Sequence, residues 1–331
     1  MSRFIQTCLA ATLALAALPA QAATICTYDP AGKSGEYYQL LSEFALEASA
    51  WGETIEIKAY TDEETASKDY EAGTCDGVVA TGVRLQRFNR FPSTIEAMGA
   101  LPSYDLLAKL VHTLATSDGA AKKLTHDGNE TVGFISVGAA YLFVRDRSID
   151  SVPKLAGKRI ATMDYDKAAP AMVERVGAII VPADLGTIGP KFNNGAVDIC
   201  YVSAPAYEPF ELHRGLADKG GILRSPLAQA TLQVMVRPSK FSEGFGKKAR
   251  TWFDGKFAQS IAAAKKAEGT IPAKYWVDIP ASEAGNWDEM FREVRIHLRD
   301  DGAYDGSMLK VMRQLRCKAD AARAECAEQK E

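Results

Sequence analysis

The chain has 331 residues, of which 47% are hydrophobic and 24% charged, and its formal net charge is −3. A chain of this length and composition can form one large or two ordinary globular domains. The charge balance excludes a strongly basic nucleic-acid-binding surface and a polybasic membrane anchor.

The first 22 residues have the pattern of a secretory signal peptide. Arg3 is followed by an apolar run over 8–18 and then by the small-residue site Ala20-Gln21-Ala22. The run is too short to span a membrane. We therefore predict cleavage after Ala22 and a protein exported to the periplasm. Export makes ATP and NAD poor cofactor candidates, so no cofactor is expected.

Five cysteines follow the predicted cleavage site, and in an oxidising compartment they are expected to form disulfides. Cys26 and Cys75 lie at the same end of neighbouring predicted strands, so we predict a bridge that stabilises the fold by roughly 4 kcal/mol. Cys317 and Cys326 are too far apart along an unbroken helix and can pair only if the tail turns back. Cys200 is then expected to be a buried strand residue.

Two stretches of the chain share one predicted order of elements: strand, helix, strand, helix, strand. They cover 24–81 and 159–203. In each stretch a Gly-x-x-Asp turn leads into the closing strand, at Gly73-Thr74-Cys75-Asp76 and at Gly195-Ala196-Val197-Asp198. This pattern predicts an α/β fold with two lobes, each containing a small, mostly parallel sheet.

Two apolar segments, 134–144 and 230–236, are long enough to cross between the lobes and are predicted to form a two-strand hinge. An amphipathic helix follows Pro238, and its aromatic stripe is expected to pack into the core. The predicted organisation is a signal peptide over 1–22, a first lobe over 23–133 with part of 237–331, a second lobe with the hinge strands over 134–236, and C-terminal helices over 237–331.

The sequence contains no complete motif for catalysis or metal binding. Gly32-Lys33-Ser34 follows the first strand as in a P-loop, but Thr27 stands where that motif needs glycine. The segment is instead expected to form a helix N-terminus, whose free amides suit an anionic ligand group. The four histidines have no partner at ligand spacing, so no metal site is expected.

Three further segments match a known family in order and spacing. They are Leu101-Pro102-Ser103, Leu155-Ala156-Gly157-Lys158-Arg159-Ile160 and Gly177-Ala178-Ile179-Ile180-Val181-Pro182. Together with the two turns, they resemble the DctP-like substrate-binding subunits of TRAP transporters. The likeness is greatest to a branch of solute-binding proteins sometimes described as multidrug-efflux components.

The resemblance implies a two-lobe periplasmic-binding-protein fold and a non-enzyme that captures a small polar solute for membrane transporter subunits. It does not extend to the family's carboxylate-clamping arginine, because aligning Gly157 puts Ala161 at that position. Arg159 is the nearest cation and is expected on the same face of the strand. Arg84 is predicted to be the principal anion contact if the solute carries a carboxylate.

Ligands of open α/β sheets bind outside the carboxyl ends of the strands. An aromatic and carboxylate-rich cleft at these ends suits a cationic or hydroxylated solute. An arginine there can form two parallel hydrogen bonds to a carboxylate or phosphate group. The candidate ligand-binding residues are Tyr28, Asp29, Ser34, Thr81, Gly82, Arg84, Arg159, Asp164, Tyr165, Asp166, Ser203 and Tyr207.

Two other functions stay open at this point. One is an exported accessory or adaptor protein of an efflux or envelope assembly, which would bind another protein through the hinge region. The other is an exported hydrolase on a similar frame, which the sequence disfavours because it shows no activated nucleophile and no metal site. A solute receptor would gain thermal stability from a small ligand, whereas an adaptor would not.

Overall fold

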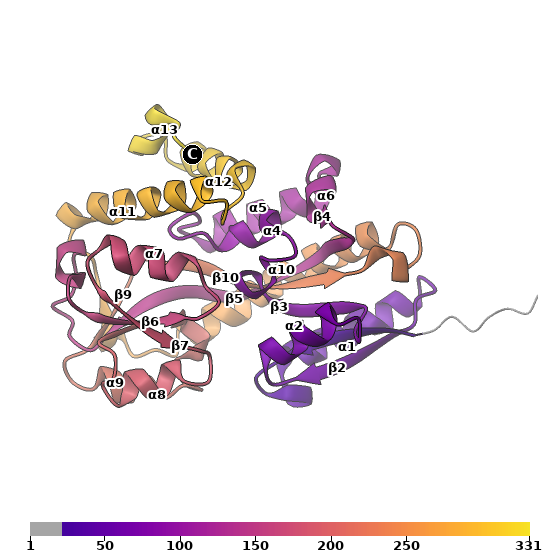
Figure 1. Ribbon diagram of the computed structural model, residues 1–331, viewed down its shortest axis with the longest axis horizontal. Helices are drawn as coiled ribbons and strands as arrows, with labels where there is room; N and C mark the ends of the chain where they lie inside the picture. The colour runs from indigo at the N-terminus through magenta and orange to yellow at the C-terminus, as the bar shows by residue number, and fades with distance from the viewer. Residues whose placement is uncertain (1–21) are drawn as a thin grey trace, which may run out of the picture.

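The computed structural model describes residues 22–331, so the predicted signal peptide lies outside the described residues except for Ala22. Two groups of parallel strands are joined by two long strands that cross the middle of the molecule (Figure 1). The strands are β1 (Ala23–Tyr28), β2 (Ile55–Tyr60), β3 (Gly77–Thr81), β4 (Thr125–His126), β5 (Asn129–Val144), β6 (Arg159–Met163), β7 (Ile179–Ala183), β8 (Ile199–Ser203), β9 (Gly221–Leu223), β10 (Ala228–Val236) and β11 (Trp276–Val277).

The two-lobe α/β prediction is confirmed, with one correction to the sheets. In the first lobe β1 pairs in parallel with β2 and β3, and in the second lobe β6 pairs in parallel with β7 and β8. Between them β10 pairs antiparallel with β3 and β5, and β5 with β8. The predicted hinge strands therefore bond to both groups, and the two expected sheets form one hydrogen-bonded path, β2-β1-β3-β10-β5-β8-β6-β7.

The helices cover the outer faces of this path and one side of the molecule (Figure 1). No helix within residues 22–331 combines the length and the apolar character needed to cross a bilayer. They are α1 (Glu36–Ser49), α2 (Glu63–Glu71), α3 (Gly82–Leu85), α4 (Arg90–Ser93), α5 (Tyr104–Thr116), α6 (Asp118–Leu124), α7 (Ala168–Arg175), α8 (Ile188–Asn193), α9 (His213–Leu216), α10 (Phe245–Glu268), α11 (Ala281–Asp300), α12 (Gly306–Ala319) and α13 (Ala324–Glu328).

The aspartates of the two Gly-x-x-Asp turns make equivalent hydrogen bonds in the two lobes. The carboxylate of Asp76 accepts a hydrogen bond from the backbone N–H of Thr24, 3.0 Å away, at the start of β1. Asp198 accepts one from the backbone N–H of Arg159, 2.9 Å away, at the start of β6. Each aspartate thus fixes the closing strand of its lobe against the opening strand.

The aromatic stripe of α10 packs into the core, as predicted. Phe253 is buried, and its ring centroid lies 4.7 Å from that of Phe44 in α1. At Gly133 of β5 a Cβ atom would come within 2.3 Å of the Phe253 ring. Glycine at this position therefore allows α10 to cross β5 in close contact.

The crossing strands contain a local irregularity in the middle of the molecule. Ala230 of β10 pairs with Gly138, and the next residue, Thr231, pairs with Ser136. Gly138 has φ +106°, a conformation that residues with a side chain rarely adopt. A bulge of this kind bends a strand where it passes from one lobe into the other.

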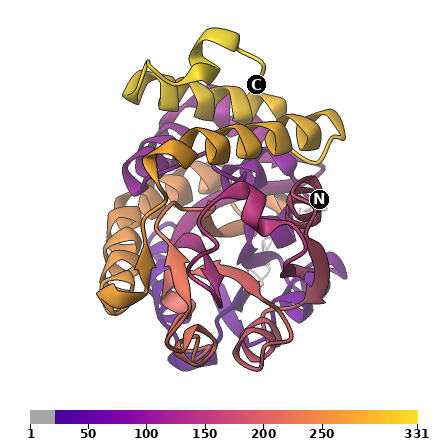
Figure 2. The ribbon, with the colours of Figure 1, turned by 90° about the vertical axis from the view of Figure 1, so that its left-hand side faces the viewer.

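The polar C-terminal tail folds back onto the molecule. The helices α11, α12 and α13 form a layer over α5 and α7 (Figures 1 and 2). Arg316 is fully buried and bonds to Glu325, Glu331 and the backbone carbonyl of Ala100. A buried charge without a partner is costly, so this network ties the end of the chain to the segment before α5.

Both expected cysteine pairs are present. Cys26 lies within β1 and Cys75 just before β3, and their Cα atoms are 5.9 Å apart. The tail turns back after α12, which brings the Cα atoms of Cys317 and Cys326 to 5.6 Å. Within the described part of the chain, Cys200 is unpaired and buried in β8, as predicted.

Removal of each disulfide should lower stability according to the loop that it closes. We expect Cys26→Ala/Cys75→Ala to lower the free energy of unfolding by about 4 kcal/mol and Cys317→Ala/Cys326→Ala by about 3 kcal/mol. Urea denaturation of both double variants measures the difference. A larger loss from the C-terminal pair would contradict the loop-entropy explanation.

Candidate functional site

A cavity of about 370 Å³ lies between the two lobes. Its lining includes the last residues of four parallel strands: Tyr28 of β1, Thr81 of β3, Met163 of β6 and Ser203 of β8. This is the position at which open α/β sheets bind their ligands. Much of the remaining wall is apolar, with Val83, Val137, Leu185, Val202, Phe210 and Leu232.

Half of the predicted ligand-binding residues line this cavity. They are Tyr28, Asp29, Thr81, Tyr165, Asp166 and Ser203. The structure does not bring the other half to its wall: Ser34, Gly82, Arg84, Arg159, Asp164 and Tyr207.

Arg159 lies at the opposite end of β6 from the cavity. Its guanidinium binds the carboxylate of Asp198, with Nη2 2.6 Å from Oδ1 and Nε 3.1 Å from Oδ2. Ala161, at the aligned clamp position, is fully buried inside β6. The nearest cation of the second lobe's opening strand therefore has a structural partner and does not replace the clamp.

The other residues outside the cavity wall have local structural surroundings. Ser34 is exposed, and its hydroxyl donates to the backbone carbonyl of Ala31, 2.8 Å away. Asp164 is exposed, and Tyr207 is buried away from the cavity. Gly82 is buried just behind the wall, while Arg84 lines a neighbouring pocket.

Asp29 occupies the helix N-terminus that the sequence offered to an anionic ligand. Its carboxylate accepts hydrogen bonds from the backbone N–H groups of Ala31, Tyr37 and Tyr38, at 2.9, 2.9 and 3.0 Å. At Gly35 a Cβ atom would lie within 2.0 Å of this carboxylate. Because the protein's own aspartate takes these amides, the expectation of a ligand anion there is wrong.

Glu96 is a largely buried carboxylate that no sequence motif predicts. It accepts hydrogen bonds from the backbone N–H groups of Gly82 and Val83, both 3.0 Å away, and from the backbone and hydroxyl of Thr231, 2.9 and 2.6 Å away. Burial raises the pKa of Glu96 to about 7, although these hydrogen bonds oppose the shift. Its carboxyl group therefore titrates near neutral pH.

Asp166 contributes a further carboxylate to the cavity, and this one comes from the second lobe. Its Oδ1 accepts from the backbone N–H groups of Ala168 and Ala169, 2.8 and 3.3 Å away, at the start of α7. Its Oδ2 accepts from the hydroxyl of Tyr201 at 2.8 Å. Burial raises the pKa of Asp166, and the three hydrogen bonds oppose that rise.

Four tyrosines surround the carboxylates: Tyr28, Tyr37, Tyr165 and Tyr201. The side chain of Tyr28 is only 9% exposed, yet no described residue gives its hydroxyl a hydrogen-bond partner. The hydroxyl of Tyr37 is also without one among residues 22–331. Burial raises the pKa of both phenols, so both stay protonated and can donate.

Arg84 is held outside this cavity by two neighbours. Its guanidinium carbon lies 3.5 Å from the ring centroid of Tyr165, a cation–π contact. Its Nε lies 3.7 Å from the carboxylate of the buried Glu63. Tyr165 lines the cavity with its ring, so the arginine stands behind the wall that this tyrosine forms.

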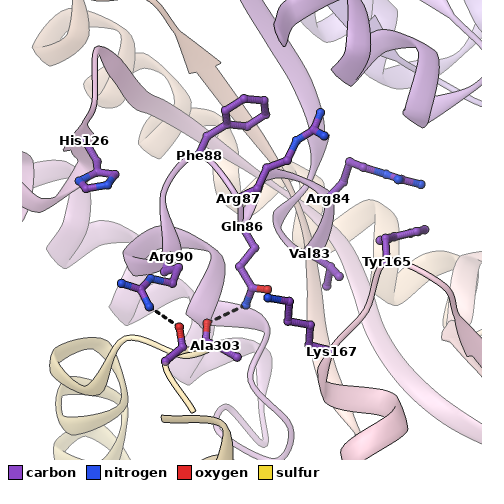
Figure 3. A pocket seen from close by; sticks show the side chains of 11 residues that line it. Val83, Arg84, Gln86, Arg87, Phe88, Arg90, His126, Tyr165, Lys167 and Ala303 are labelled. Carbon is purple, nitrogen blue, oxygen red and sulfur yellow. Dashed lines mark hydrogen bonds between the residues drawn. The ribbon is translucent and has the colours of Figure 1, made fainter. Parts of the chain in front are cut away.

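The neighbouring pocket, about 240 Å³, carries the opposite charge (Figure 3). Basic side chains in its lining are Arg84, Arg87, Arg90, His126 and Lys167. By contrast, the described residues that line the interlobe cavity include no lysine, arginine or histidine. Basic side chains therefore line the neighbouring pocket, and carboxylates line the interlobe cavity.

Four polar residues of the cavity wall were not predicted from the sequence: Glu36, Tyr37, Glu96 and Tyr201. Tyr37 stands in the first turn of α1, and Tyr201 alternates with buried residues along β8, so both positions carried a usable signal. Glu96 ends a three-residue 3₁₀ helix after α4, which is too short for periodicity to indicate which way its side chain points. Only the tertiary structure brings it beside Thr231.

Comparisons with known proteins agree with this architecture. Residues 42–331 match the family described as solute-binding protein AdeT 1/2. A probable solute-binding protein AdeT1 from Acinetobacter baumannii is 40% identical over 300 residues, which is 91% of this chain and 98% of that protein.

Solved structures are similar in fold at low sequence identity. A TRAP periplasmic solute-binding protein from Ralstonia eutropha, with bound (S)-2-acetolactate, has a TM-score of 0.71 at 13% identity and covers 89% of this chain and 98% of its own. One from Rhodoferax ferrireducens, with bound malonate, has a TM-score of 0.68 at 16% identity and covers 91% of this chain and 100% of its own. These likenesses show the two-lobe fold.

The raised pKa of Glu96 predicts a pH-dependent stability. The folded protein holds this proton more tightly than the unfolded chain, in which glutamate titrates near 4.5. The stability from this proton is fully present below that value and is lost as the pH rises through about 7. We expect Glu96 to make the free energy of unfolding about 1 kcal/mol lower at pH 8 than at pH 6.

Urea denaturation of the wild type and Glu96→Gln at both pH values measures this contribution. The variant should show the smaller difference between pH 6 and pH 8. The same pH dependence in both proteins would contradict the assignment to Glu96.

Proposed function

Because this chain belongs to the AdeT 1/2 family of solute-binding proteins, we propose that it is a periplasmic receptor that captures one small molecule in the interlobe cavity for membrane transporter subunits. One observation carries the proposal: four strands from both lobes end at a single cavity of about 370 Å³. That volume lies within the range of about 300–1,000 Å³ common for small-molecule sites.

The exported location is part of the proposal. The family is one of solute-binding proteins, and β1 begins at Ala23, directly after the predicted cleavage site. The two disulfides fit an oxidising compartment. The mature N-terminus at Ala23 can be read directly by sequencing the protein purified from the periplasm.

Capture is proposed to involve closure of the lobes over 23–133 and 134–236 about the crossing strands β5 and β10. The bulge at Gly138 supports this proposal, because irregular pairing lets a strand bend at limited cost. Residues of both crossing strands, Val137 and Leu232 among them, line the cavity. A ligand there contacts the bending segment as well as both lobes.

The adaptor and hydrolase alternatives receive less support. Binding of another protein through the hinge region would not require an interlobe cavity at the ends of the strands. A hydrolase needs an activated nucleophile, and Cys200 does not suit that role, because it is fully buried and burial raises the pKa of its thiol.

Ligand capture tests the function with the solute still unidentified. Protein stripped of ligand by unfolding and refolding is incubated with the small-molecule fraction of a cell extract and separated by gel filtration. Mass spectrometry should then detect one retained compound, and small-angle scattering should show a smaller radius of gyration. Ala230→Phe, which places a ring in the cavity, should abolish retention.

Ala262→Phe, on the exposed face of α10, is the matched control and should retain the compound as the wild type does. No retained compound and no change in the radius of gyration for the wild type would contradict the proposed function. Retention by Ala230→Phe would place the site elsewhere.

A further inference from the structure

Three carboxylates that accept backbone hydrogen bonds line the interlobe cavity from three separate parts of the chain, beside the exposed Glu36 of α1. They are Asp29 after β1, Glu96 before α5 and Asp166 before α7. Each accepts hydrogen bonds from backbone N–H groups, and none forms an ion pair with any residue in 22–331. Hydrogen bonds from amides orient these carboxylates, and when the groups are ionised no cation of the described residues compensates their charge.

The tyrosines give the same wall an aromatic character. Rings of Tyr28, Tyr37 and Tyr201 line the cavity together with the carboxylates. The faces of aromatic rings attract cations, most strongly where water is excluded. Tyr28 is 9% exposed and its hydroxyl has no partner among the described residues, so this hydroxyl is available to a molecule in the cavity.

An anionic solute finds no cationic partner among the described residues of this cavity. The lining contains no lysine, arginine or histidine, and Arg84 is engaged by Glu63 and by the ring of Tyr165. A carboxylate placed here would face like charges with no cation to offset them, which costs free energy. The bound acids named for the similar structures, malonate among them, therefore do not transfer to this chain.

We propose that the cavity selects an organic cation, namely a small molecule with an ammonium group and an apolar body. This inference rests on the proposed function, since it assumes that the cavity is the solute site. The ammonium group lies among the carboxylates and the tyrosine rings. The apolar body packs against the aliphatic and aromatic wall that includes Leu185, Val202 and Phe210.

Matched probes with one body and three head groups test the charge class. They are 2-phenylethylammonium, 3-phenylpropanoate and the neutral 2-phenylethanol, added to ligand-free protein at pH 8 and followed by thermal shift and calorimetry. We expect saturable binding of the ammonium compound, with at least tenfold lower Kd than for the alcohol, and no binding of the carboxylate.

A matched pair of aspartates two residues apart tests the contact. In Asp166→Asn the side-chain carbonyl can still accept from Ala168 and Ala169, so the start of α7 is preserved while the charge is removed. This variant should weaken binding of 2-phenylethylammonium by about tenfold to a hundredfold. Asp164→Asn removes the charge of an exposed neighbour outside the cavity and should leave Kd unchanged.

A second variant tests the aromatic part of the site. Tyr28→Leu removes the ring and the hydroxyl and should weaken the ammonium probe more than the alcohol. Circular dichroism and thermal unfolding without ligand show whether each variant is folded, and wild-type binding of the three probes stands as a test independent of the variants.

Three results would overturn the cation assignment: tighter binding of the carboxylate than of the ammonium compound, no binding of the ammonium compound, or an unchanged Kd in Asp166→Asn. None of these results bears on whether the protein retains a solute from an extract. Failure of the assignment is therefore distinguishable from failure of the proposed function.

Discussion

The antiparallel pairing of β10 with β5 is the constraint on which the rest of the structure depends. It places two long strands between two groups of parallel strands and joins all of them in one hydrogen-bonded path. Because each lobe is attached through its closing strand, β3 or β8, the carboxyl ends of both groups open toward one space. The bulge at Gly138 then gives this rigid connection a place to bend.

Charge is arranged around this frame by the backbone itself. Backbone amides hold the carboxylates of Asp29, Glu96 and Asp166 at the wall of the cavity. The nearest arginine, Arg84, is turned to the far side of Tyr165, where other basic side chains gather. The chain thus keeps the fold of the acid-binding structures but presents negative charge where an acid would need positive charge.

The sequence predicted most of the framework because its signals are local. Periodicity located the strands and α10, and the oxidising compartment together with the expected position of both cysteines at the same end of neighbouring strands paired Cys26 with Cys75. The site was predicted only in part, because a strand end indicates a direction but not a partner. Arg159 was expected near the ligand, yet its binding to Asp198 is a tertiary contact that no spacing reveals. The same holds for Glu96 and Thr231.

A crystal structure of the protein with 2-phenylethylammonium tests the central claim most directly. We expect the nitrogen inside the interlobe cavity, within hydrogen-bond distance of Asp166 or Glu96, and the phenyl ring against the apolar wall. A solute held instead in the basic pocket beside Arg84 and Lys167, with the interlobe cavity occupied only by water, would contradict it.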